Sequence, residues 1–159
     1  MGKNSFEYKL IKGRIAETIF ELMFRDTKKF TVLHFGYEST VPTLAQYRDT
    51  VVMQKVINQV DKSPDFVLVT ENKEQVYFVE VKYRSEIDNK EILKTCLEIS
   101  KRWELCYLFV ISKDGFYFSP INTIINKHGE LEKLATTWIS TEIQDKYKIL
   151  VKDFLLKYE

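Results

Sequence analysis

The stretch PDFVLVTENKEQVYFVEVKY, residues 64–83, decides the fold of this protein. Its two runs of β-branched and aromatic residues, 66–69 and 75–83, have the composition of β-strands. The polar segment 71–74 separates them, and so short a connection joins antiparallel neighbours. We therefore expect an antiparallel β-hairpin.

The segments before the hairpin predict a helix, a strand and a second helix. Residues 5–25 carry two apolar stripes at helical spacing, so we expect this helix to be buried on two sides. Residues 31–37 have strand composition, and Pro42 suits the first turn of a helix that spans 42–60. The two stripes of the first helix contain Ile11, Ile15, Ile19, Leu22 and Met23, and Phe6, Leu10, Phe20 and Phe24.

The segments after the hairpin predict a helix, two strands and a last helix. Asp88 followed by Glu91 has the form of a capping box, which begins a helix. A nearly unbroken apolar run then predicts a strand buried on both faces. After an irregular stretch, an amphipathic helix follows that we expect to pack on the domain rather than to form a dimer face. The expected elements are a helix from Asp88 to about Trp103, strands at 105–112 and 116–119, and a helix at 142–157.

Helices and strands therefore mix along one chain, in the order αβ(α)ββαβ followed by a C-terminal helix. Such an order predicts an α/β fold with a central mixed β-sheet flanked by helices. We expect a single domain over residues 1–159. Its core would span about 5–119, and a C-terminal helical extension about 120–159.

The composition is that of a folded protein with balanced charge. Of the 159 residues, 45% are hydrophobic and 30% charged, with 5 Gly and 3 Pro, which excludes collagen-like and disordered classes. The 24 Lys and Arg nearly balance the 23 Asp and Glu, so the chain lacks the strong basic charge of histone-like proteins. A basic surface on one side of the molecule remains compatible with this balance.

Cysteine and histidine are too few for a closed zinc site. Cys96 and Cys106 form no CxxC pair, and the chain has 2 His, so we expect any metal to be held by oxygen ligands. The N-terminal residues contain no signal-like apolar run, and no stretch approaches about 18 apolar residues. We therefore expect a cytoplasmic protein with reduced thiols and no membrane partner.

Asp65, Glu80 and Lys82 form the constellation with chemical potential. Glu80 and Lys82 are two positions apart on one strand and share a face, and the hairpin brings Asp65 beside Glu80. Two converging carboxylates repel each other unless a cation lies between them, and Mg²⁺ prefers carboxylate and phosphate oxygens. A lysine beside such an ion can position a water or offset charge developing on phosphorus. Alternatively, Asp65 caps a turn and the other two residues form a solvated pair on an edge strand.

These residues resemble the motif of the PD-(D/E)xK nuclease superfamily. PD at 64–65 and EVK at 80–82 stand on a hairpin, after a helix and before a helix and a buried strand, and the resemblance covers residues 5–112. The superfamily includes restriction endonucleases, archaeal Holliday-junction resolvases and the nuclease domains of recombination helicases. The resemblance implies a restriction endonuclease-like fold.

The resolvase-like members are nearest, because they also carry Gly-x-x-x-Glu in the first helix. Here Gly13 and Glu17 match that motif, and Gly13 would leave room for a close approach beside Glu17. The resemblance implies that Glu17 is a third acid of the site, with Glu21 as its competitor. The chain departs from compact resolvases in the 47 residues between Glu17 and Asp65, which include the helix expected at 42–60.

The resemblance also implies the roles of the motif residues. Asp65 and Glu80 would ligate Mg²⁺, for which Mn²⁺ can substitute, together with the Val81 carbonyl. Glu17 would complete the metal site directly or through water. Lys82 would orient or activate the water that attacks the phosphorus.

The sequence thus predicts a Mg²⁺-dependent nuclease acting on DNA, alone, as a homodimer or within a larger DNA-processing complex. Arg84, Lys90 and Lys94 are candidates for phosphate contacts, although each also fits an ordinary solvated charge. We expect His34 to be a packed or surface residue rather than a catalyst. The alternatives are a non-cleaving nucleic-acid-binding or assembly subunit of the same fold, and a protein-interaction domain that uses its last helix.

Overall fold

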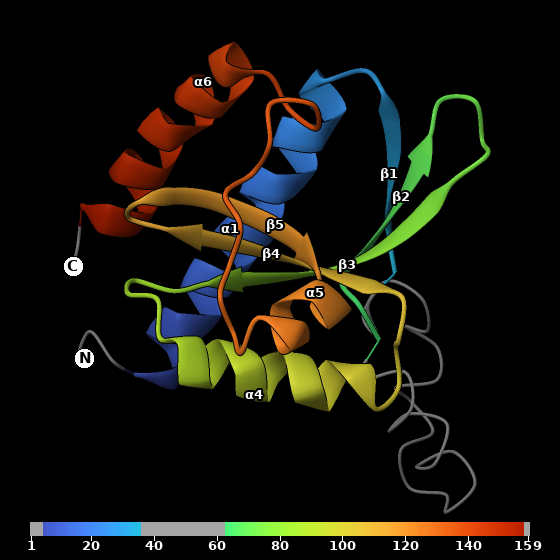
Figure 1. Cartoon of the computed structure of the whole chain (residues 1–159). Coiled ribbons are helices and arrows are strands. Elements are labelled where there is room, and N and C mark those ends of the chain that lie inside the picture. Colours follow the sequence, from blue (N-terminus) through green and yellow to red (C-terminus); the bar gives the residue numbers. More distant parts are fainter. Residues whose placement is uncertain (1–4, 36–62, 158–159) are drawn as a thin grey trace, which may run out of the picture.

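The computed structural model describes residues 5–35 and 63–157, and its centre is a five-stranded sheet with the order β1-β2-β3-β4-β5 (Figure 1). All neighbouring strands are antiparallel except β3 and β4, which are parallel, so the sheet is mixed. Helices pack on both faces, which confirms the α/β class with a central mixed sheet. The strands are β1 (Phe30–His34), β2 (Phe66–Thr70), β3 (Val76–Tyr83), β4 (Cys106–Ser112) and β5 (Gly115–Pro120).

The predicted hairpin is confirmed as β2 and β3. Its register pairs Phe66 with Val79, so the next step of the ladder places Asp65 opposite Glu80. The turn between the strands holds Lys73 in the left-handed region, with φ of 60°, and the Asn72 side chain accepts a hydrogen bond from the backbone of Glu74 at 3.1 Å. Side-chain bonding of this kind is why Asn favours turns.

The helices form two layers around the sheet. On one side, α1 and α6 share a core with Val79 and Val81 of β3, and on the other, α4 and α5 pack against Phe78. Figure 1 shows α4 and α5 on the side of the sheet opposite α6. The helices are α1 (Phe6–Asp26), α4 (Asn89–Ser100), α5 (Ile121–Asn126) and α6 (Thr141–Val151), which continues into a single π-helical turn, η2 (Lys152–Leu156).

The expectation that α1 is buried on two sides is wrong. Its buried residues form one stripe at i, i+3, i+4, i+7 and i+8, which is what a helix packed on one face of a sheet presents. Most of the other apolar positions face outward: Phe6 is 77% exposed, Ile11 58% and Leu22 46%, while Ile15 is partly buried against the core. The buried stripe contains Ala16, Ile19, Phe20, Met23 and Phe24.

The elements after the hairpin follow the expectation closely. The Asp88 side chain accepts hydrogen bonds from the backbone of Lys90 and Glu91 and so caps α4, which ends at Ser100 rather than near Trp103. β4 is paired on both edges and buried on both faces, as its apolar run predicts. Cys96 and Cys106 are free and buried.

Several boundaries differ from the expectation. The stretch before the last helix is not irregular throughout, because it contains α5, in which Ile121 and Ile124 are buried at helical spacing. The last helix packs into the core as expected through Tyr147 and Val151, but Phe154 is 58% exposed. β1 begins at Phe30 and ends at His34. The helix expected at 42–60 lies outside the described residues.

No helix in residues 5–35 or 63–157 has both the length and the apolar character needed to cross a membrane.

Candidate active site

The predicted residues Glu80, Lys82 and Arg84 lie toward the end of the sheet at which the parallel strands β3 and β4 finish. At this edge α1 begins, the β3–α4 connection leaves the sheet, and η2 ends (Figure 1). A groove of about 1100 Å³ opens here between the first turns of α1 and the end of β3. Its charged lining consists of the cations Lys9, Lys12, Lys82, Arg84 and Lys113 and the acids Glu17, Glu86, Asp88 and Glu91.

Asp65 is held in place by two backbone contacts just before β2 begins. Its carbonyl accepts a hydrogen bond from the Phe35 N–H at 3.0 Å, which ties it to the end of β1. Its carboxylate oxygen Oδ2 accepts one from the Val81 N–H at 2.8 Å, which ties it to β3. The alternative in which Asp65 only caps a local turn therefore does not describe it, since its carboxylate crosses to the neighbouring strand.

Glu80 and Lys82 share one face of β3, as their spacing predicts. The Lys82 ammonium is paired with the Glu80 carboxylate. The Glu80 side chain is 15% exposed and that of Lys82 32%, so the pair is not a solvated one on an edge strand. β3 is the middle strand of the sheet. Lys82 lines the groove, whereas Asp65 and Glu80 are not among its lining residues and lie deeper.

Burial makes the carboxylates of this site weak acids. Burial raises the pKa of Asp65 to about 6, although the Lys82 charge and the Val81 N–H oppose the shift, and the charge of Glu17 adds to it. Burial, together with the charge of Asp65, raises the pKa of Glu80 against the opposing effect of Lys82. Ionising these two buried carboxylates therefore costs free energy, and a further cation beside them would stabilise their charged forms.

Lys82 keeps its proton in this arrangement. Burial by itself disfavours the ammonium, but the charges of Glu80 and Asp65 outweigh that effect and raise the pKa of Lys82. A protonated lysine donates hydrogen bonds and accepts none. In the metal-free protein Lys82 is therefore a hydrogen-bond donor, which suits the role of orienting a water.

Of the two candidate third acids, Glu17 lines the groove and Glu21 does not. Glu17 lines the groove, and its charge acts on Asp65. Its carboxylate forms an ion pair with Arg14 at 3.1 Å. Glu21 forms ion pairs with Arg25 at 2.7 Å and with His34 at 2.9 Å and does not line the groove.

His34 is a surface residue of β1 whose side chain is 50% exposed, one of the two places expected for it. Its imidazole, besides contacting Glu21, lies with its centroid 4.9 Å from the ring of Phe66. These contacts occupy the imidazole on β1 and on the core, away from the groove lining.

The sequence suggested that a close approach of a neighbouring group requires glycine at position 13, and the structure does not support that reason. A Cβ at Gly13 would meet no atom within 4 Å, so no neighbouring element requires glycine there. Gly13 instead lines the groove one turn before Glu17. A missing side chain at this position widens the groove.

The basic walls of the groove come mostly from residues that the sequence did not single out. Lys9 and Lys12 line it, and the Lys12 ammonium lies 5.0 Å from the ring centroids of Tyr8 and Tyr83. Lys9 precedes Gly13 and Glu17 at intervals of four residues, a helical spacing that was the available signal.

Of the predicted phosphate ligands, Arg84 lines the groove, while Lys90 and Lys94 do not. The Arg84 backbone N–H donates to the Ile111 carbonyl at 2.9 Å, which holds the end of β3 against β4. Lys90 and Lys94 are exposed on α4. The side of α4 that borders the groove carries acids instead.

The donor set fits a magnesium ion held by two carboxylates. In residues 5–35 and 63–157, no three Asp, Glu, His or Cys side chains come together as a ready metal cluster. Mg²⁺ is commonly bound by one or two carboxylates with waters and substrate phosphate oxygens completing its shell. Asp65 and Glu80, both hard oxygen donors with raised pKa, suit that mode.

The sequence matches no protein-family model and no curated protein.

Proposed function

We propose that this protein is a Mg²⁺-dependent nuclease of the PD-(D/E)xK type that hydrolyses phosphodiester bonds in DNA. The observation that carries the proposal is the Asp65 carboxylate, which reaches across the hairpin to the Val81 N–H beside the buried Glu80–Lys82 pair. The groove over this pair carries Lys9, Lys12 and Arg84 among its lining residues, and these can contact a phosphate. Free cysteines in both α4 and β4 suit a reducing compartment such as the cytoplasm.

In this proposal the deep carboxylates hold the metal and the groove residues hold the substrate. Bound Mg²⁺ lowers the pKa of a water and neutralises phosphate charge. Asp65 and Glu80 supply carboxylate oxygens, and the Val81 carbonyl adjoins them on the strand. Glu17, at the groove wall, would complete the metal site directly or through a water, and its carboxylate also contacts Arg14.

Lys82 orients the attacking water and stabilises the charge that gathers on the phosphate. Its ammonium pairs with the Glu80 carboxylate, and Lys82 also lines the groove. The ammonium can therefore donate a hydrogen bond to Glu80 or to an oxygen of a molecule bound in the groove. Lys9 and Arg84 line the same groove and can bind the non-bridging oxygens of the phosphate that is attacked. Such preplaced donors lower the barrier because they need no reorganisation during the reaction.

The test is cleavage of supercoiled plasmid, single-stranded DNA, a four-way junction and RNA in Mg²⁺, Mn²⁺ or EDTA. We expect cleavage of DNA with either metal and none with EDTA. Asp65→Asn and Lys82→Ala should lose at least about 100-fold in rate, which is the usual scale for such groups. The matched control is Glu98→Gln, which removes an exposed acid of α4 that does not line the groove, and it should keep its activity. Full activity of Asp65→Asn would contradict this site.

One observation favours a second candidate, a nucleic-acid-binding subunit that does not cut. Asp65 and Glu80 lie below the groove lining, and Lys82 already neutralises one of their charges. A site of this kind can bind a phosphate backbone through its cationic walls without placing metal beside it. Salt-dependent DNA binding with no cleavage in Mg²⁺ or Mn²⁺ would favour this candidate.

A further inference from the structure

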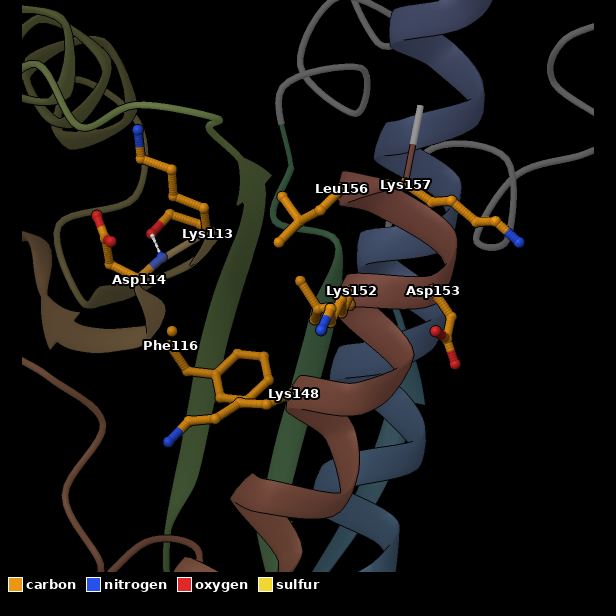
Figure 2. Close-up of a pocket in the computed structure, with 11 residues that line it drawn as sticks. Lys113, Asp114, Phe116, Lys148, Lys152, Asp153, Leu156 and Lys157 are labelled. Carbon is orange, nitrogen blue, oxygen red and sulfur yellow. Dashed lines mark hydrogen bonds between the residues drawn. The ribbon is translucent and has the colours of Figure 1, made fainter. Parts of the chain in front are cut away.

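A second cavity, of about 680 Å³, lies between the β4–β5 turn and the end of the last helix (Figure 2). Its floor is apolar: Phe116 is 2% exposed and Val151 4%, and Leu156 of η2 borders it. In Figure 2, Leu156 points from the helix toward the β4–β5 turn. The proposed chemistry uses none of these residues.

The rim of this cavity is basic. Its lining contains Lys113, Lys148, Lys152 and Lys157 against two acids, Asp114 and Asp153. Figure 2 shows the Lys148 side chain extended along the ring of Phe116, whereas Asp153 and Lys157 point away from the turn.

A further lysine supports the β4–β5 turn. The Lys133 ammonium donates to the Asp114 carbonyl at 2.8 Å. The same ammonium lies 3.9 Å from where a Cβ of Gly115 would stand, and the Lys148 Cε lies 3.8 Å from that point. The Lys133 ammonium and the Lys148 side chain therefore both lie against the turn, and the Lys148 ammonium is also ion-paired with Asp145 at 3.3 Å.

Lys113 belongs to both this cavity and the groove of the proposed active site. Because β3 and β4 are parallel, the residues that follow them emerge at the same edge of the sheet. The Lys113 ammonium lies 3.5 Å from the Glu86 carboxylate of the β3–α4 connection, and both side chains are at least half exposed. Lys113 thus joins the groove to a cavity whose rim also carries Lys148 and Lys152.

We propose that the second cavity binds the sugar-phosphate backbone of the nucleic acid to one side of the phosphate that is attacked. This inference rests on the proposed function and extends it, because it assigns a second contact with the same substrate. Lysines act as point charges for phosphates. The apolar floor between them accepts the carbon face of a sugar. Charge complementarity and continuity with the groove through Lys113 select this occupant.

The test measures binding and needs no cleavage. A fluorescein-labelled DNA duplex is titrated with the full chain in Ca²⁺ buffer and followed by fluorescence anisotropy over a range of salt concentrations. K148Q/K152Q removes two charges from the rim, and K148R/K152R keeps them. The matched control is K29Q/K73Q, which removes two exposed lysines beside the β2–β3 turn, at the other end of the sheet.

We expect K148Q/K152Q to weaken DNA binding about tenfold at ~0.1 M salt and to reduce the slope of log K against log salt by about 1.8, because two phosphate contacts are lost. K148R/K152R should bind as the wild type does, and so should K29Q/K73Q. Unchanged binding by K148Q/K152Q would overturn the inference, as would an equal loss in K29Q/K73Q.

A second measurement separates this inference from the proposed activity. Hydrolysis of bis(p-nitrophenyl) phosphate, a phosphodiester too small to reach the second cavity, should be the same in wild type and K148Q/K152Q. If the wild type cleaves nothing while K148Q/K152Q loses DNA binding, the proposed activity is wrong and the second contact stands. If the wild type cleaves DNA while K148Q/K152Q binds normally, the second contact is wrong. A wild type without DNA affinity refutes both.

Discussion

Replacing Asp65 by Asn should make the metal-free protein more stable at neutral pH. Asn has almost the shape of Asp and keeps an oxygen that can accept the Val81 N–H. It removes a negative charge from a place where burial raises the pKa of the carboxyl to about 6 from its ordinary 3.8. The stability gained is the free energy that the folded protein spends on ionising Asp65.

The magnitude follows from linkage. Because the folded pKa is raised, the folded state holds its proton where the unfolded state has lost it, and wild-type stability falls as pH rises from about 4 to about 6. Each pH unit between the folded and unfolded pKa values of Asp65 corresponds to about 1.36 kcal/mol. Ionising Asp65 in the folded protein therefore lowers its stability by about 3 kcal/mol above pH 6. The free energy of unfolding of Asp65→Asn should therefore exceed that of the wild type by about 1 kcal/mol at pH 4.5 and by about 3 kcal/mol at pH 7.5.

The assay is urea denaturation followed by circular dichroism, with EDTA present, at these two pH values. Glu86→Gln, which removes a carboxylate that is 83% exposed, is the control and should change stability little at either pH. The reasoning is refuted if Asp65→Asn is less stable than the wild type at neutral pH. It is equally refuted if the difference between the two proteins does not depend on pH.

Three further predictions concern other parts of the molecule. Added Mg²⁺ should raise the melting temperature of the wild type but not of Asp65→Asn, because a ligand present at 100 times its Kd stabilises by about 2.7 kcal/mol; equal shifts in both would place the metal elsewhere. Asp26→Asn should destabilise the protein at neutral pH, because hydrogen bonds from Lys146 and Tyr147 hold the pKa of Asp26 below its usual 3.8. That stabilisation is present above pH 3.8 and is lost as pH falls through the lower folded pKa, so the denaturation curves of the two proteins should converge in acid. A stability difference that stays the same at every pH would contradict the hydrogen bonds. Gly13→Ala should raise the free energy of unfolding by about 0.5–1 kcal/mol, because Ala suits a helix interior better than Gly and a Cβ would meet no atom within 4 Å. A lower free energy of unfolding in urea denaturation would show that the groove is narrower than described.

Features that depend on near neighbours in the chain were predictable from the sequence. The β2–β3 hairpin follows from two strand-forming runs around a short polar turn, and the cap at Asp88 from its distance to Glu91. The pairing of Asp65 with β3 followed as well, because the hairpin register fixes which residue faces which. Alternation along one strand was enough to place Glu80 and Lys82 together.

The choice between Glu17 and Glu21 was not predictable, because both lie on the same helix one turn apart. Their environments differ only in the folded molecule, where Glu21 meets His34 of β1 and Glu17 faces the groove. The exposed side of α1 was missed for a related reason. An apolar stripe such as the one through Ile11 and Leu22 shows that a face can be buried, but not that another element covers it.

The sequence by itself determined the α/β class, the hairpin and the identity of the acid and lysine residues that the hairpin brings together, because each depends on spacing within a few residues or across one turn. Only the tertiary structure decided how deeply those charges are buried, and hence the raised pKa of Asp65 and of Glu80. It also decided that Lys113 joins the groove to a second basic cavity. Burial and long-range proximity depend on how distant segments pack, which the local pattern of residues does not specify.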